Sequence, residues 1–228
     1  MKITAAICML MDHIGLMFFP QQIAWRMIGR LAMPIFAFGI GRGAYYTSSM
    51  KNYMKKMFIF AVISQLPFWW VEQLAFGGEF LSLSFNIGFT FLWALMIIAC
   101  TQHSQKEKRS LRLIELLTIF GLLLSSDLLG FDYGSYGIMV VLMCYFVRVK
   151  WQDQDKTWLI VLGYTVITYL GFINHLSGFL LQEIGVIGLI LTGGLQNISE
   201  KKMSRFFYIF YPVHLILLCV IKWGMIKL

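Results

Sequence analysis

Charged residues are scarce in this sequence: only 13% of its 228 residues are charged, against about 25% in an average soluble domain. Hydrophobic residues make up 59%, and the mean hydropathy is +0.73. A soluble globule of this size has too little interior for so many apolar side chains, and a disordered chain would leave them in water. The alternating ten-residue segments that are typical of an outer-membrane barrel are also missing. The composition therefore indicates an all-α, polytopic membrane protein.

Cysteine motifs are missing as well. Cys8, Cys100, Cys144 and Cys219 lie in or at the ends of apolar segments, without CxxC or CxxH spacing. Thiols in such positions are usually buried and inert. We therefore expect neither a disulfide nor a metal site.

Apolar runs between charge clusters predict about nine transmembrane helices, within a range of eight to ten. The first run contains Asp12 and His13, and no small-x-small cleavage site follows it, so we expect a span rather than a signal peptide. No long linker or internal repeat interrupts the chain, which predicts a single transmembrane domain over residues 1–228. The predicted segments are 3–19, 23–46, 57–76, 87–101, 111–130, 133–149, 157–175, 178–197 and 206–225.

Basic residues fall on alternate connections of this arrangement. The net charge of +8 is the topological signal of a membrane protein rather than a sign of nucleic-acid binding. If the segments alternate in direction, all but four of the 19 Lys and Arg lie on one side, the exceptions being Arg26, Arg30, Lys222 and Lys227. The positive-inside rule therefore predicts a cytoplasmic N-terminus and, with nine spans, an external C-terminus.

Ionisable residues gather at one depth in the first two segments. His13 lies about 15 Å along a helix from Ile3, where the first segment begins on the cytoplasmic side. The second segment begins at the outer surface, and Arg30 lies about 10 Å below that surface. Arg26 precedes Arg30 by four residues, so both project from the same face of the helix. Asp12 and His13 project about 100° apart, so we expect Asp12 to pair with Arg30 or Arg26 and His13 to point into a cavity. Intramembrane charges usually mark a functional site; a structural Asp–Arg bridge with a satisfied histidine is the alternative.

Other polar residues are weaker candidates. Asp132 lies in the glycine-containing connection SSDLLGFDYGSYG, where a tight turn or close ligand approach is expected. His214 follows the helix-bending Pro212 in the last segment, and it is as readily a core histidine as a site residue. Asn86 and Gln65, at the edges of two segments, are expected to line a cavity.

The chemistry of these groups allows several functions. A histidine can act as a general base or be acylated itself, and a nearby arginine can stabilise an oxyanion. Basic clusters on the cytoplasmic side can hold the phosphates of a nucleotide-containing donor. The same buried charges also suit a proton-coupled transporter, or a structural subunit of an envelope complex.

Five local strings, in order, carry a family resemblance: KITAAICMLMDHIG, RMIGRLAMPIFAFGIGRGAYYTSSMKNYMKK, ISQLPF, DYGSYGI and FYPVHL. They resemble the TraX-like family, which is named for the acetylation of conjugative pilin and looks related to the transmembrane acyltransferase superfamily. The resemblance implies an acetyltransferase of the bacterial cytoplasmic membrane. Acetyl-CoA would be its co-substrate, and the acceptor a peptide N-terminus or a hydroxyl of a surface glycan or lipid.

The resemblance also implies roles for particular residues. It gives His13 the catalytic role and matches the family's RxxxR pair to Arg26 and Arg30. Our own expectation is that Asp12 and Arg30 hold the site and that Arg26 stabilises charge near the outer mouth. It adds His214 from the YPxHL string and Asp132 from the DYG string. The expected site for the phosphates of acetyl-CoA comprises Lys55, Lys56, Lys201, Lys202 and Arg205. We expect no metal, and we predict no particular oligomer.

Overall fold

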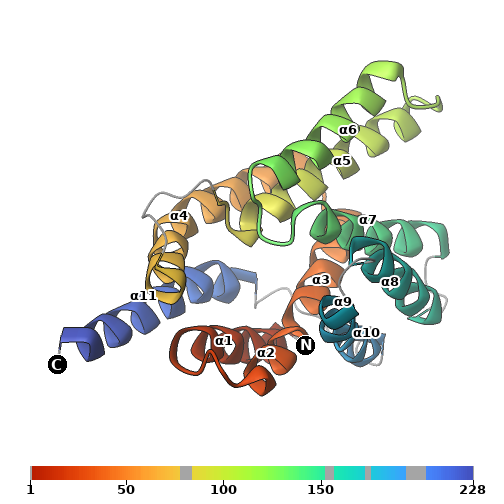
Figure 1. The fold of residues 1–228 in the computed structure, drawn as a ribbon. Helices are drawn as coiled ribbons and strands as arrows, with labels where there is room; N and C mark the ends of the chain where they lie inside the picture. Colours follow the sequence, from red (N-terminus) through yellow and green to blue (C-terminus); the bar gives the residue numbers. More distant parts are fainter. Residues whose placement is uncertain (1, 78–83, 152–156, 173–175, 194–203, 228) are drawn as a thin grey trace.

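The protein is almost entirely helical in the computed structural model, which describes residues 2–77, 84–151, 157–172, 176–193 and 204–227 (Figure 1). This confirms the all-α fold class. Within these ranges the helices are α1 (Lys2–Phe18), α2 (Ile23–Gly29), α3 (Ala32–Tyr46), α4 (Met50–Phe76), α5 (Ile87–Lys106), α6 (Leu113–Leu128), α7 (Gly134–Trp151), α8 (Thr157–Gly171), α9 (Leu176–Glu183), α10 (Gly185–Gly193) and α11 (Ser204–Lys227).

Four helical stretches among the described residues are long and apolar enough to cross a membrane: Ile23–Tyr46, Met50–Phe76, Ile87–Lys106 and Phe206–Lys227. Shorter apolar helices occupy Ile3–Phe18, Gly134–Val147, Trp158–Gly171 and Leu176–Ile190. Large apolar side chains are exposed on their outer faces, including Ile63, Leu66 and Phe120, as suits a protein surrounded by lipid. The structure thus has the character of a membrane protein, while the nine-span count and the cytoplasmic N-terminus stay predictions.

The predicted segment 23–46 is divided into α2 and α3 by a break at Arg30 and Leu31. Pro34 explains the break, because it has no N–H to donate to the carbonyl of Arg30, and its ring would clash with that carbonyl in a continuous helix. Arg30 ends α2 instead, its backbone N–H donating to the carbonyl of Arg26 at 3.1 Å. Arg30 therefore lies at a junction between helices, where the sequence had suggested the middle of one helix.

The hydrophobic core has two parts. The larger part surrounds α3 where it packs against α5, α7 and α10, and includes the fully buried Leu95, Ile98 and Ile138. The smaller part lies where α1, α4 and α11 meet, and includes Met17 and Leu215. The four cysteines are free, and the described residues contain no group of His, Cys, Asp and Glu suited to a metal.

The first and last helices run side by side in the same direction. His13 of α1 contacts His214 of α11, and further along both helices the Nζ atom of Lys222 lies 5.5 Å from the centre of the Phe18 ring. Because both contacts follow the same order in the two helices, α1 and α11 are parallel. Parallel helices in a bilayer begin on the same side, as the first and last of nine alternating segments would.

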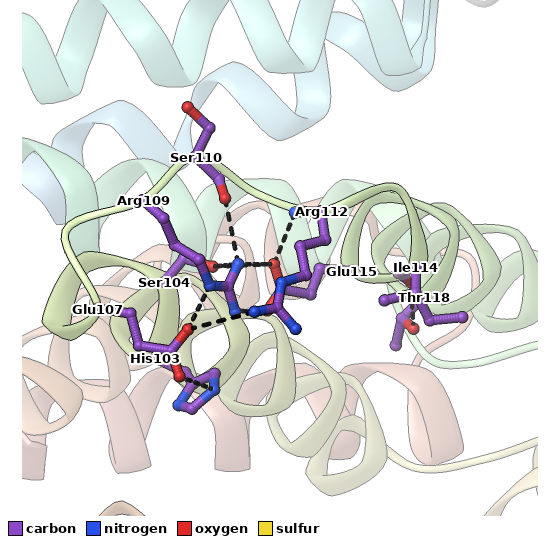
Figure 2. Close-up of polar contacts among 9 residues, drawn as sticks. All are labelled: His103, Ser104, Glu107, Arg109, Ser110, Arg112, Ile114, Glu115 and Thr118. Carbon is purple, nitrogen blue, oxygen red and sulfur yellow. Dashed lines mark hydrogen bonds and ion pairs between the residues drawn. The ribbon is translucent and has the colours of Figure 1, made fainter.

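The helices α5 and α6 lie side by side and extend from the rest of the bundle (Figure 1). A cluster of polar side chains joins them at their connected ends. The guanidinium of Arg109 donates to both carboxylate oxygens of Glu115, at 2.7 Å each, and also contacts Glu107 (Figure 2). The hydrogen bond from Arg109 lowers the pKa of Glu107. The Nε2 atom of His103 lies 3.0 Å from Oε1 of Glu107. The connection between these helices is therefore held by charged and titratable side chains.

Candidate active site

Two histidines from the opposite ends of the chain meet inside the helix bundle. The Nε2 atom of His214 lies 3.2 Å from Nδ1 of His13, and the ring centres are 5.0 Å apart. His214 is only 4% exposed, and its ring stacks on Phe210 with a centre-to-centre distance of 4.9 Å and an interplanar angle of 15°. Tyr211 places its ring edge-on to both histidines. The structure therefore joins two residues that the sequence offered as separate candidates.

Asp12 forms an ion pair with Arg26, with 2.9 Å between Oδ2 and Nη1. Of the two arginines expected as its partner, Arg26 is thus the one that bonds it. The second oxygen, Oδ1, is buried and has no hydrogen-bond partner among the described residues. Gly29 makes the pair possible, because a Cβ there would lie 2.1 Å from Oδ1 of Asp12. The helix α2 therefore approaches Asp12 through a glycine.

Arg30 bonds a residue far along the chain. Its Nη1 atom donates to the hydroxyl of Tyr133 at 3.0 Å, while its buried Nε has no partner among the described residues. Tyr133 has a positive φ of 62°, a conformation that costs about 1–3 kcal/mol for a residue with a side chain and is found mostly at functional sites. The backbone at Tyr133 is thus held in an unfavourable conformation that presents its hydroxyl to Arg30.

Asp132 is fixed by its backbone rather than by its carboxylate. Its N–H donates to the carbonyl of Phe85 at 2.8 Å, and its own carbonyl accepts from the hydroxyl of Thr90 at 2.6 Å. These bonds attach the connection before α7 to the start of α5. The carboxylate lies within electrostatic range of Arg30 and Arg26, and it has no ion-pair partner among the described residues.

A cavity of about 660 Å³ lies between the connection before α7 and the α2–α3 junction. The cavity is lined by polar residues from four parts of the chain, which include Arg26, Arg30, Asp127, Asp132, Tyr133 and Gln182. His13 is not among the residues that line this cavity, so the expectation that it points into a cavity stays a prediction. Arg26 connects the two regions, because it lines the cavity, bonds Asp12 and lies within electrostatic range of His13.

Asn86 and Gln65 bond each other and do not line this cavity. The side-chain amide of Asn86 donates to Gln65 at 2.7 Å and to the carbonyl of Ala61 at 2.8 Å, and its oxygen accepts from the N–H of Gly88. Asn86 is fully buried. The two residues therefore join α4 to the start of α5, and their expected role in lining a cavity stays a prediction.

The expected donor site is described only in part. Lys55 and Lys56 are exposed on α4. Lys201 and Lys202 lie outside the described residues, and the described part of Arg205 does not include its side chain. Whether these five cations share one surface therefore stays a prediction.

Glu183 is a polar residue of the bundle that the sequence analysis did not single out. It ends α9, and its Oε2 atom accepts from the hydroxyl of Thr165 at 3.1 Å. Its other oxygen, Oε1, is buried without a hydrogen-bond partner among the described residues. A carboxylate within the apolar run FLLQEIGVIGLI is the kind of signal that marks an intramembrane site, and it was available in the sequence.

The described structure is of an all-helical protein of the membrane class. Its site combines a pair of histidines with two arginines, Arg26 and Arg30, which line a polar cavity. Arg26 also forms an ion pair with Asp12. The chain belongs to the TraX protein family, which matches residues 1–222.

Two relatives align over nearly the whole chain. It is 26% identical over 237 aligned residues to "Probable fimbrial assembly protein FimC, serogroup H1" of Dichelobacter nodosus, covering 97% of this chain and 94% of that protein. It is 24% identical over 229 residues to "Protein TraX" of Escherichia coli, covering 96% of this chain and 85% of that protein. No solved structure matches the chain.

Proposed function

We propose that the protein is a membrane acetyltransferase, related to the transmembrane acyltransferases, in the bacterial cytoplasmic membrane. It would take an acetyl group from cytoplasmic acetyl-CoA and transfer it to an acceptor at the outer face. The observation that carries the proposal is the contact between His13 and His214 beside the Asp12–Arg26 pair. A partly buried histidine at this place can serve as a general base or as an acyl carrier.

The reaction needs a proton acceptor and a group that stabilises negative charge. As a base, His13 takes the proton of an acceptor amine or hydroxyl, which attacks the thioester carbonyl while the C–S bond breaks and CoA leaves as the thiolate. As a carrier, His13 forms the bond to the acetyl carbon itself before the acceptor attacks. Arg26 is the cation that we assign to the oxyanion of either route, since it lies within electrostatic range of His13 and its charge persists at any accessible pH.

Acetyl-CoA fits the side of the bundle where α1, α4 and α11 begin. Lys56 precedes Phe60 by four residues, or about 6 Å along α4. The Phe60 ring contacts Tyr211, whose ring contacts His13. Phosphates held by Lys55 and Lys56, together with Lys201, Lys202 and Arg205, would thus leave the thioester arm a short distance to cover before it reaches His13.

The polar cavity is the proposed entrance for the acceptor. Arg30, Asp132 and Tyr133 in its wall offer donors and acceptors for a peptide N-terminus or for a hydroxyl of a surface glycan or lipid. The Dichelobacter relative is named a probable fimbrial assembly protein. A subunit of a surface fibre is therefore the acceptor to test first.

Transfer from labelled acetyl-CoA tests the proposal. Purified protein in detergent or liposomes should release CoA when an acceptor peptide is present, and His13→Ala should abolish this release. His103→Ala is the matched control, because it removes an exposed histidine from the last turn of α5 and should leave turnover unchanged. Equal turnover in His13→Ala and wild type would remove His13 from the mechanism.

A proton-coupled transporter is the second candidate, because the same chain of buried charged and titratable groups could pass protons. The two functions differ in ligand binding. A transferase should show a rise in thermal stability with CoA, since a ligand that binds only the folded state stabilises it. Solute flux that follows a pH gradient, with no response to CoA, would favour the transporter.

A further inference from the structure

The backbone determines which ring nitrogen carries the proton in both histidines of the pair. Nδ1 of His13 lies 2.8 Å from the carbonyl oxygen of Met9, and Nδ1 of His214 lies 2.8 Å from that of Phe210. A carbonyl oxygen can only accept a hydrogen bond. In the neutral form each ring therefore carries its proton on Nδ1 and leaves a lone pair on Nε2.

This assignment gives the contact between the two rings a direction. Because Nε2 of His214 carries a lone pair, it accepts from the Nδ1–H of His13 across 3.2 Å. The single Nδ1 proton of His13 is thus shared between the Met9 carbonyl and the ring of His214. Nε2 of His13 forms no hydrogen bond to the described residues and keeps its lone pair for an incoming group.

In the described part of the chain, no side chain other than His214 is placed to accept that proton. Asp12 is bonded to Arg26, and Arg26 is the cation within electrostatic range of His13. Tyr211, from α11, contacts both rings, and Glu72 of α4 interacts electrostatically with Tyr211. In a Ser-His-Asp triad, an aspartate accepts the Nδ1–H of the catalytic histidine. Among the described residues, His214 is the side chain that takes this place beside His13.

We infer that His214 is a positioning residue that accepts the Nδ1 proton of His13 when Nε2 of His13 gains a proton or an acetyl group. This inference rests on the proposed function. Either event makes the His13 ring cationic, and the shared proton then moves toward His214. A neutral imidazole suits this position, because a second buried carboxylate would be costly inside the membrane.

The proton balance is closed in both routes. In the carrier route the bond from Nε2 to the acetyl carbon forms, the C–S bond breaks, and CoA leaves as the thiolate. The acetylated ring then passes its Nδ1 proton to Nε2 of His214, which becomes an imidazolium still bonded to the Phe210 carbonyl. When the acceptor attacks the acetyl carbon, the bond to Nε2 of His13 breaks, His214 returns its proton to Nδ1 of His13, and the acceptor's proton goes to the CoA thiolate. In the base route Nε2 of His13 receives the acceptor's proton, and the pair later returns one proton to the CoA thiolate.

Nitrogen NMR of histidine-labelled protein in detergent tests the pair without any turnover. His13 and His214, assigned from the spectra of His13→Gln and His214→Gln, should both show a protonated Nδ1 and a bare Nε2. Loss of the His214 acceptor in His214→Phe should shift the Nδ1 signal of His13, whereas His103→Ala should not. A protonated Nε2 on neutral His13, or an unchanged His13 signal in His214→Phe, would overturn the inference.

Kinetics provide the second readout. His214→Phe should lower kcat for CoA release by about 10- to 100-fold, the range seen when a metal-bound histidine loses its hydrogen-bonded partner, with KM for acetyl-CoA unchanged within about twofold. His214→Gln, whose amide oxygen can accept the hydrogen bond but not the proton, should recover part of the loss. If the wild-type protein shows the expected tautomers but transfers no acetyl group, the proposed acetyltransferase function is refuted and the hydrogen-bonded histidine pair is retained. If it transfers the acetyl group but shows the opposite tautomers, the function is retained and the proposed role of His214 is refuted.

Discussion

The close approach of Gly29 to Asp12 allows the sharpest test of the site geometry. An alanine Cβ at this position would lie 2.1 Å from Oδ1 of Asp12 and 2.4 Å from its Cβ and Cγ. These distances are far below van der Waals contact, so either the Asp12 side chain or the whole of α2 must move. Movement of either one disturbs the 2.9 Å contact between Asp12 and Arg26.

The expected cost of Gly29→Ala combines two effects. Overpacking of a filled site costs about 1–3 kcal/mol, and weakening of the partly exposed Asp12–Arg26 pair adds about 1 kcal/mol after allowance for screening. We therefore expect a loss of about 2–4 kcal/mol in the free energy of unfolding. At about 2–4 °C per kcal/mol for a chain of this size, Tm should fall by about 4–16 °C.

Thermal unfolding in detergent can be followed with a dye that reacts with cysteine thiols, because Cys8, Cys144 and Cys219 are buried. Gly39→Ala is the matched control, since a Cβ at Gly39 meets no atom within 4 Å. It should raise stability by about 0.5–1 kcal/mol, the usual helical preference for alanine. If Gly29→Ala unfolds at the wild-type temperature or above, the close approach of α2 to Asp12 is incorrect.

Three further changes test other parts of the structure by the same thermal assay. Gly134→Ala should destabilise by about 1–3 kcal/mol, because its φ is +45° and a Cβ would lie 2.3 Å from Oδ1 of Asp127; unchanged stability would contradict the described turn. Asn86→Ala should cost at least about 2 kcal/mol, since it leaves several buried groups unpaired, and Asn86→Asp should recover little of that loss. Glu107 has a lowered pKa, so its contribution is present above its unfolded-state pKa of about 4.3 and lost as pH falls below it. Glu107→Gln should therefore reduce the loss of stability between neutral and acid pH, and an identical pH profile would show that this pair is unimportant.

The positions of the helices followed from the sequence, whereas their interruptions did not. Apolar runs and charge clusters locate helices because lipid excludes charge and unpaired backbone groups. The break between α2 and α3 depends on one residue, Pro34, which in a membrane helix can equally be tolerated within a continuous span. The break near Gly185 likewise needed the tertiary structure.

The pairing within the site was predictable only where depth determined it. Counting along the chain placed Arg30 at the depth of Asp12 and left Arg30 and Arg26 as alternative partners, and only the structure shows that Arg26 is the one that bonds Asp12. The partner of Arg30 was not predictable in this way, because Tyr133 lies 103 residues away. Its orientation depends on a positive φ that the sequence does not reveal.

The separation of the two histidines has a consequence for assembly of the site. His13 and His214 are 201 residues apart, so their contact cannot form until the last helix has entered the membrane. The α1–α11 contact also covers the smaller hydrophobic cluster, which includes Met17 and Leu215. Closing the bundle and placing His214 behind His13 are therefore the same event, and a chain without α11 would lack both. A partly inserted chain would thus have its candidate base and acyl carrier without the group that receives its proton.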